Sequence, residues 1–228
     1  MTMCGRFALF TSGEDLLTQF GVAETAVAVS RIAPRYNIAP TQPVVAVRST
    51  PSEQRELTFL QWGLIPSWAK DPKIGSRLIN ARAETVAEKP SFRAAFKRRR
   101  CLVLADGFYE WQKRNGKKQP TFIHMADKRP FALAGLWETW HSPDGGELDT
   151  CTILTTTPNP FMTPIHNRMP VILAAEDYDT WLFPGEQPNI ALHVLRPFSA
   201  AEMSAYPVST WVNSPAHDDA QCIIPLEN

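Results

Sequence analysis

The chain has little of several features that define large classes of proteins. It contains no run of 18 or more apolar residues, which excludes a membrane-spanning helix. It has only four cysteines, Cys4, Cys101, Cys151 and Cys222, scattered without a CxxC pair. This argues against a disulfide framework and a zinc site. The N-terminus also lacks the charged and then apolar layout of a signal peptide. We therefore expect a cytoplasmic protein that holds no metal or other cofactor.

Glycine is scarce beside proline, with 11 residues against 20. This balance favours fixed turns and short strands over a helical bundle. Strands are expected at residues 44–48, 57–62, 101–105, 121–125, 131–137, 150–155, 171–174 and 206–212. Helices are expected at residues 13–20, 91–99, 176–182 and 188–194. The two kinds of element do not alternate regularly, so residues 1–228 are predicted to form a single α+β domain. We expect mixed, mainly antiparallel β-sheets with a barrel-like core, flanked by short helices.

The net charge of the chain is zero, but its basic and acidic residues are strongly segregated along the sequence. Residues 70–118 hold 14 of the 23 Lys and Arg residues and only five acids, whereas residues 119–228 hold four bases and 13 acids. The basic block is suited to attracting a polyanion. A solvated surface, with the run at residues 97–100 complementing a helix end, explains the same pattern. Both interpretations stay open at this point.

Cys4 lies near the start of the chain, directly after Met3. If translation begins at Met3 and that methionine is removed, Cys4 carries a free α-amine and a thiol on adjacent carbons. The amine has a pKa of roughly 8, so a useful fraction is neutral at pH 7. The thiol is a competent nucleophile even when little is ionised. Together they can close a thiazolidine on an aldehyde. A buried, inert cysteine is the structural alternative.

Three further polar side chains stand in apolar or turn-like surroundings. Asn80 follows an apolar pair and can orient a carbonyl or an amine, with an Asx-type turn as the alternative. Glu110 lies between aromatic residues, where loss of solvent raises a carboxyl pKa and suits it to proton transfer. The polar face of an edge strand is its alternative. His166 follows a proline-containing turn, and a structural histidine is the alternative there.

Arginines and an aromatic residue accompany these positions. Arg6, Arg82 and Arg168 each neighbour one of them, and guanidinium groups match phosphate well. Trp68 lies in a proline-containing loop, where it can stack on a base or enter a gap in a duplex, unless it is a core residue. A set of Cys, His and Glu also suits a cysteine hydrolase. Spacing along the sequence does not show that these groups meet in space.

A series of short motifs, in one order and across nearly the whole chain, resembles a known family. The motifs are Met3-Cys4-Gly5-Arg6-Phe7, Tyr36-Asn37-Ile38-Ala39-Pro40, Trp62-Gly63-Leu64-Ile65-Pro66, Ile79-Asn80-Ala81-Arg82-Ala83-Glu84-Thr85, Gly107-Phe108-Tyr109-Glu110-Trp111, Ala134-Gly135-Leu136-Trp137, Ile165-His166-Asn167-Arg168-Met169-Pro170 and Pro207-Val208-Ser209 followed by Val212-Asn213. The chain is similar to the SRAP (SOS response-associated peptidase) family, whose members shield abasic sites in DNA by covalent cross-linking.

The resemblance implies a role for each matching residue. Cys4 corresponds to the nucleophile that captures the aldehyde of the abasic site as a thiazolidine, and Asn80 to the residue that positions the reacting groups. Glu110 corresponds to the proton-transfer residue, and His166 to the one that assists sugar-ring opening. The implied DNA-binding residues are Arg6, Asn37, Pro40, Trp68, Arg82, Thr155 and Arg168.

The resemblance also implies a partner and secondary activities. The expected partner is single-stranded DNA containing abasic sites, or its junctions with duplex, bound by a monomer. In the cell we expect the protein in the cytoplasm, at the nucleoid after DNA damage. Abasic-site lyase activity by β-elimination, and self-processing that corresponds to the peptidase label, are further expectations.

Two features depart from the family's pattern. Met1 and Thr2 precede Met3. A free amine on Cys4 therefore requires either translation from Met3 followed by removal of that methionine, or processing that removes all three residues; without these the cross-linking function is lost. Ala69 follows Trp68, where some members carry a second aromatic residue that helps to open a duplex. Two other functions stay open: an N-terminal-nucleophile cysteine peptidase or amidohydrolase, and a non-covalent DNA-binding module.

Overall fold

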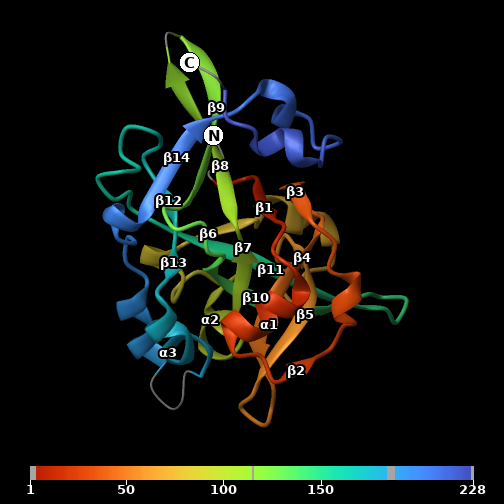
Figure 1. The fold of residues 1–228 in the computed structure, drawn as a ribbon. Coiled ribbons are helices and arrows are strands. Elements are labelled where there is room, and N and C mark those ends of the chain that lie inside the picture. The colour runs from red at the N-terminus through yellow and green to blue at the C-terminus, as the bar shows by residue number, and fades with distance from the viewer. Residues whose placement is uncertain (1–3, 115, 184–187, 227–228) are drawn as a thin grey trace.

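A closed ring of strands lies at the centre of the molecule (Figure 1). The computed structural model describes residues 4–114, 116–183 and 188–226. Within these ranges the ring runs β11, β10, β7, β4 and β5, and the parallel pairing of β5 with β11 closes it. Its members are β4 (Pro43–Ser49), β5 (Arg55–Trp62), β7 (Arg100–Ala105), β10 (Phe131–His141) and β11 (Glu147–Thr156). The shorter β2 (Glu24–Thr25), β6 (Asn80–Arg82), β12 (Met169–Pro170) and β13 (Ile172–Leu173) pair with them.

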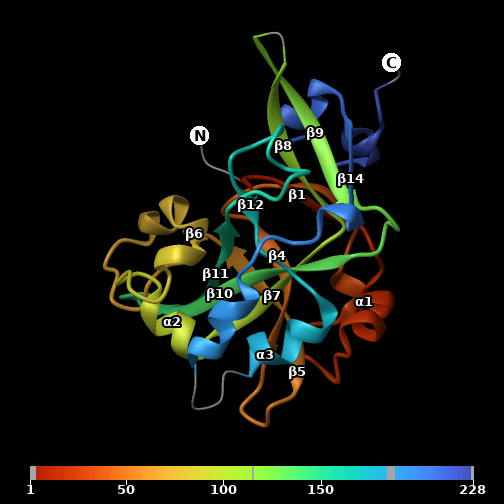
Figure 2. The same cartoon turned by 90° about the vertical axis from the view of Figure 1, so that its left-hand side faces the viewer.

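A second sheet packs beside the ring and carries a projecting hairpin. Its order is β14 (Met203–Pro207), β9 (Lys117–Met125), β8 (Gly107–Arg114), β1 (Phe7–Leu9) and β3 (Arg35–Ile38). Figures 1 and 2 show that the β8–β9 hairpin extends beyond the body of the molecule. Most strand pairs in both sheets are antiparallel, so the predicted α+β class with a barrel-like core is confirmed.

Short helices flank the sheets, as the sequence predicts. α1 (Gly13–Phe20) begins where Ser12 accepts the backbone N–H of Asp15 and ends at Gly21, whose φ is 57°. The other α-helices are α2 (Arg93–Arg98) and α3 (Tyr178–Leu182). The 3-10 turns are η1 (Val29–Arg31), η2 (Pro72–Arg77), η3 (Ala83–Thr85), η4 (Ala175–Asp177), η5 (Pro188–Val194), η6 (Ala200–Glu202), η7 (Thr210–Asn213) and η8 (Ala220–Ile223). In the described part of the chain, none of these helices has the length and apolarity needed to cross a bilayer.

Three local predictions differ from the structure. The strand expected at residues 206–212 ends at Pro207, because Ser209 accepts the N–H of Trp211 and starts η7 instead. Residues 188–194 form a 3-10 helix, η5, with no α-helix there. Asn80 begins strand β6, so the Asx-turn alternative is wrong.

The basic run at residues 97–100 proves partly structural. Arg99 donates to the carboxylate of the buried Glu138. Arg100 is only 1% exposed, and its guanidinium lies 4.9 Å from the ring of Phe96 and 5.2 Å from that of Trp181. Burial lowers the pKa of Arg100 to about 10. Arg99 therefore ties the end of α2 to β10, and Arg100 stabilises the packing of α2 against α3 and is too buried to bind a phosphate.

Candidate active site at the start of β8

Cys4 and Glu110 meet although 106 positions separate them in the sequence. β1 pairs with β8 at Phe7 and Phe108, so Glu110, two residues further along β8, lies level with the residues that precede β1. The backbone N–H of Cys4 donates to Oε1 of Glu110 at 2.8 Å. The nitrogen predicted to act as the nucleophile therefore contacts the predicted proton-transfer group directly.

Burial sets the protonation of both groups. Glu110 is 4% exposed, and loss of solvent raises its pKa to about 7 against the hydrogen bonds from the Cys4 and Trp111 backbone. Cys4 is fully buried in the main hydrophobic cluster, and burial, together with the nearby Glu110, raises the pKa of its thiol well above the usual value. At neutral pH the thiol is protonated, while Glu110 is divided between its two forms. The burial expected under the structural alternative for Cys4 is therefore present, and the thiol must become accessible before it can react.

A pocket of about 410 Å³ opens beside this pair. It is lined by Gly5, Arg6, Glu110, Trp111, Lys118, His166 and Asn213. The lining combines three basic side chains with one carboxyl group and one large aromatic ring, a composition suited to an anion that carries a flat or ring-shaped group. Across the described residues, no three His, Cys, Asp or Glu side chains gather as a metal-binding group.

Arg6 is held against the pocket wall by several partners. Its Nη1 donates to Oδ1 of Asn37 at 2.7 Å and to the carbonyl of Val212 at 2.9 Å. Its guanidinium lies 5.7 Å from the ring of Trp111, whose Nε1 donates to Oδ1 of Asn213 at 2.7 Å. Burial lowers the pKa of Arg6, but the ordinary pKa of an arginine is so high that the guanidinium stays charged at neutral pH. A pre-oriented cation therefore lies beside Glu110.

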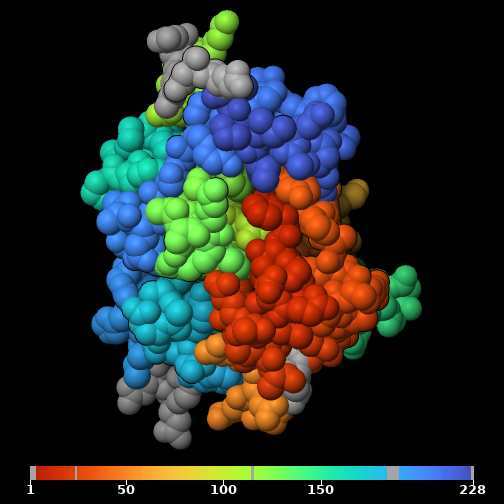
Figure 3. All heavy atoms as spheres, viewed as in Figure 1, coloured from red at the N-terminus to blue at the C-terminus, as the bar shows by residue number. Residues whose placement is uncertain are grey.

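Asn37, predicted to bind DNA, lies behind Arg6 and is fully buried. Its Nδ2 donates to the carbonyls of Val212, Ser214 and His217 at 3.1, 3.0 and 2.6 Å. Figure 3 shows the result, with the C-terminal segment packed against residues from the first fifth of the chain. Asn37 thus connects β3 to that segment and orients Arg6.

His166 reaches the pocket from the loop that joins β11 to β12. Its Nδ1 accepts the backbone N–H of Arg168 at 3.2 Å, which leaves the ring proton on Nε2 in the neutral form. Partial burial lowers its pKa, so the imidazole is neutral at pH 7. The loop is tied to the hairpin because Nε2 of Gln112 donates to the carbonyl of Pro164 at 2.9 Å.

Asn80, Arg82 and Thr155 lie on neighbouring strands. β6 pairs in parallel with β11, which places Asn80 opposite Ile153 and Arg82 opposite Thr155. Asn80 is half-buried, Arg82 is exposed and Thr155 is buried, with its hydroxyl donating to the carbonyl of Ala81. None of the three is among the residues that line the pocket in the described structure, so they form its surroundings rather than its wall.

Arg168 joins these strands to the His166 loop. Its guanidinium binds both carboxylate oxygens of Glu84, with Nη2 2.9 Å from Oε2, and also donates to the carbonyl of Thr155 at 2.6 Å. The pair holds the pKa of Glu84 below its usual value. Of the two arginines on this side, Arg82 is therefore the more open to a ligand.

Two predicted contact residues lie at turns outside the pocket. Trp68 is 60% exposed in the loop after β5, which excludes the core alternative for this tryptophan. Pro40 is partly exposed at the turn after β3. Contact of either residue with DNA stays a prediction.

Four side chains of the site were not assigned from the sequence. Trp111, Lys118 and Asn213 line the pocket, and Glu84 binds Arg168. Trp111, Asn213 and Glu84 stand inside the quoted family motifs, and Lys118 lies at the end of the basic block. The motifs therefore carried the signal, but the partners of each residue depend on segments far away in the sequence.

The fold and this pocket define a class of α+β protein whose site is built around a cysteine near the N-terminus and a buried glutamate. Within that class the chain belongs to the SRAP family, described as SOS response associated peptidase, which matches residues 3–215.

Individual relatives agree with the family assignment. The chain is 46% identical over 223 residues to "Abasic site processing protein YoqW" of Bacillus subtilis (strain 168), covering 97% of this chain and 99% of that relative. It is 38% identical to "Abasic site processing protein HMCES" of Gallus gallus, covering 86% of this chain and 68% of the relative. A crystal structure of a protein from Bacteroides thetaiotaomicron superposes with a TM-score of 0.88 at 27% identity, over 98% of this chain and all of that one.

Proposed function

We propose that this protein processes abasic sites in DNA by trapping them covalently through Cys4, with residues 1–228 acting as one SRAP-like domain. The observation that carries the proposal is the hydrogen bond from the Cys4 nitrogen to Glu110, beside a pocket that also holds Arg6 and His166. The names of the relatives support the choice of substrate.

The proposal requires a free amine on Cys4, and the backbone supports its release. The φ angle of Cys4 is 45°, in the left-handed region, which costs a residue with a side chain about 1–2 kcal/mol. A first residue has no φ, so removal of residues 1–3 relieves this strain. Translation from Met3 followed by removal of that methionine, or self-processing that removes residues 1–3, would supply the free form.

The amine acts first and the thiol follows. Glu110, with a pKa of about 7, accepts a proton from the Cys4 ammonium and returns it to the departing oxygen. The neutral amine adds to the aldehyde of the opened sugar, and loss of one water gives an imine. The Cys4 thiol then adds its sulfur and proton across the C=N bond, which closes the thiazolidine. One water is released in total, and no oxidant is needed.

The surrounding residues open the sugar and hold the strand. Because Nδ1 of His166 is occupied, the neutral ring presents its Nε2–H, which donates a hydrogen bond to the sugar ring oxygen as the ring opens. Asn80 positions the reacting groups, Arg6, Arg82 and Arg168 bind phosphates, and Trp68 stacks on a base. Thr155 and Pro40 lie along the path of the strand.

Further properties belong to the same proposal. The expected substrate is an abasic site in single-stranded DNA or at a junction with duplex, bound by a monomer during the response to DNA damage. An imine that is not closed by the thiol is open to β-elimination, so lyase activity is expected as a minor outcome. Release of residues 1–3 by the protein itself is the expected peptidase activity.

Denaturing electrophoresis of protein mixed with a single-stranded abasic oligonucleotide tests the proposal. Protein that begins at Cys4 should give a slowed covalent band, whereas protein that retains Met1-Thr2-Met3 and protein with Cys4→Ala should give none. An equal band from Cys4→Ala would contradict the mechanism. Turnover of a peptide substrate without DNA by the same protein would instead favour the amidohydrolase alternative.

A further inference from the structure

The β8–β9 hairpin carries lysines that the proposed reaction does not use. Lys113 pairs directly with Lys118 across the two strands, and Arg114 pairs with Lys117. The three lysines are exposed. Like charges placed directly opposite each other destabilise a strand pair. The Lys113–Lys118 pair is of this kind, so it conflicts with folding and indicates a functional constraint on the hairpin.

The register places Lys118, one member of this pair, on the wall of the pocket. Side chains alternate between the two faces of a strand, so Trp111, Lys113 and Lys118 share one face of the hairpin, and Gln112 and Lys117 share the other. Trp111 and Lys118 both line the pocket. The face of Gln112 is turned to the His166 loop through its contact with Pro164. Lys113 and Lys118 therefore continue the Trp111 wall toward the tip.

We propose that Lys113 and Lys118 form a phosphate-binding track that holds the DNA strand where it leaves the pocket. This inference rests on the proposed function. Lys113 lies two residues beyond Trp111, roughly 7 Å further along β8, because a strand rises about 3.3 Å per residue. Each ammonium group binds one phosphate of the strand, and these two phosphates offset the repulsion between the lysines. The hairpin projects past the body of the molecule, so it extends the site on one side only (Figure 1).

Protection of a sheet edge is the alternative explanation for these lysines. Beyond Tyr109, no strand in the described part of the chain pairs with the outer edge of β8. Lysines on such an edge discourage pairing between molecules. That role predicts aggregation on their removal and no change in the affinity for DNA, so the two explanations are separable.

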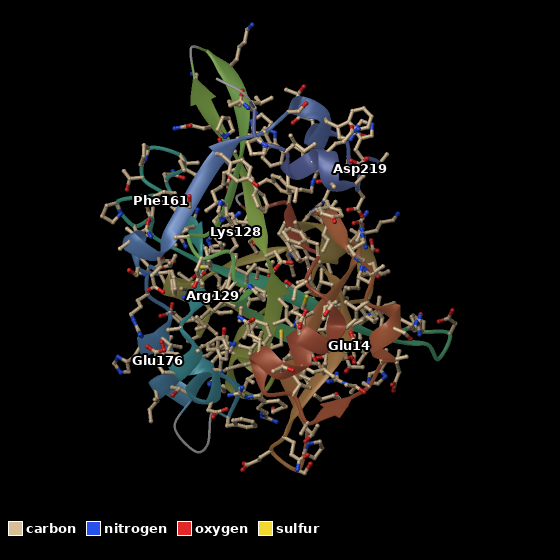
Figure 4. All side chains as sticks on the ribbon, viewed as in Figure 1. Glu14, Lys128, Arg129, Phe161, Glu176 and Asp219 are labelled. Atoms are coloured by element: carbon tan, nitrogen blue, oxygen red, sulfur yellow. The ribbon has the colours of Figure 1, made fainter. Side chains whose placement is uncertain are left out.

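Salt-dependent binding of an undamaged single-stranded oligonucleotide tests the track. Each phosphate contact contributes about 0.7 to the slope of log K against log salt concentration for single strands, so K113Q/K118Q should lower the slope by about 1.4. Its dissociation constant at about 0.1 M salt should rise roughly 10- to 30-fold. K117Q, on the opposite face of the same tip, and K128Q should each stay within about twofold. Figure 4 places Lys128 on the body of the molecule, away from the hairpin tip.

Two further measurements separate this inference from the proposed function. Removing nucleotides from one end of the oligonucleotide should weaken binding, whereas removing them from the other end should not. In K113Q/K118Q the affinity should no longer depend on which end is shortened. An unchanged slope in the double variant, or an equal loss in K117Q, overturns the track. At saturating abasic DNA, K113Q protein that begins at Cys4 should still cross-link fully, because Lys113 is not among the residues that line the pocket. Lysine-dependent binding without any cross-link in protein that begins at Cys4 overturns only the proposed function, and no binding of DNA at all overturns both.

Discussion

Glu110 is a buried carboxyl group, and burial of its charged form destabilises the folded protein. Its pKa is raised from an ordinary value of 4.5 to about 7, with burial as the main cause. Between these values the unfolded chain gives up a proton that the folded protein retains. The free energy of unfolding therefore falls as pH rises through this window, and the full penalty is present above pH 7. A catalytic pKa near neutrality is thus obtained at the expense of stability.

Glu110→Gln should raise the stability of the protein and lower the rate of cross-linking. At pH 8 the free energy of unfolding in urea should rise by about 3 kcal/mol, because the pKa is shifted from 4.5 to about 7 and one pKa unit corresponds to about 1.4 kcal/mol. At pH 4 it should change little. The rate of cross-linking should fall by about 100-fold or more, since an amide cannot accept the proton. Glu147→Gln, at an exposed position on β11, is the control and should change neither quantity. An equal gain in stability at both pH values would contradict the assignment.

Asn37 stabilises the fold through the hydrogen bonds that its side chain makes with buried carbonyl groups and with Arg6. Asn37→Ala should lower the free energy of unfolding by about 3 kcal/mol, because it removes donors from three carbonyls and an acceptor from Arg6 inside the protein. Chemical denaturation measures the loss, and hydrogen exchange should rise at residues 209–217. Asn167→Ala, at an exposed position, should stay within about 0.5 kcal/mol. Unchanged exchange in that segment would show that Asn37 does not anchor it.

At the scale of elements, β8 organises the site more than any other strand. Its first half pairs with β1 and brings Glu110 to Cys4, while its second half presents Trp111 and Lys113. The position of β8 depends on its close approach to β9 at Gly107. A Cβ atom there would lie 2.2 Å from the ring of Phe122 and 2.8 Å from the carbonyl of Ile123.

Gly107→Ala should therefore loosen the junction of β1, β8 and β9. A backbone carbonyl cannot move aside as a flexible side chain can, so we expect a loss of about 2–4 kcal/mol in the free energy of unfolding. Cross-linking should slow because Cys4 and Glu110 lose their common frame. Gly146→Ala is a matched control, since its nearest neighbour would lie 3.8 Å away. Equal stability of the two variants in denaturant would contradict the packing argument.

At the scale of the whole molecule, the packing conceals all four thiols. Cys4, Cys101, Cys151 and Cys222 are free and buried, and burial raises the thiol pKa of each. In protein that retains Met1, alkylation at pH 8 should be at least about 100-fold slower than in urea at every cysteine, because it waits for opening of the fold. Peptide mass spectrometry of the alkylated protein measures each site.

Protein that begins at Cys4 provides the informative comparison. There only Cys4 should react faster, because thiazolidine closure requires its sulfur to reach the pocket. Rapid alkylation of Cys101 or Cys151 in the folded protein would show that the barrel opens more readily than the structure indicates.

Most of the fold could be predicted because local patterns determined it. The apolar runs that became β4, β5, β7, β10 and β11 read as strands by themselves, and Ser12 and Gly21 mark the ends of α1. The late strand was misplaced because Ser209 caps a 3-10 turn within a β-rich run. The long β8–β9 hairpin was missed in part because polar and charged residues interrupt its pattern.

For the candidate site too, some features could be predicted from the sequence and others depend on the tertiary structure. The sequence alone determined which chemical groups are present: a cysteine near the N-terminus, a glutamate among aromatic residues, a histidine and several arginines. Only the tertiary structure decided that the Cys4 nitrogen touches Glu110, that Asn37 and Arg100 serve the packing, and that Glu84 occupies Arg168. The reason is physical. Residue types follow from the chain, but hydrogen-bond partners and desolvation arise only when segments up to about 200 positions apart pack together, and these set each group's pKa and availability.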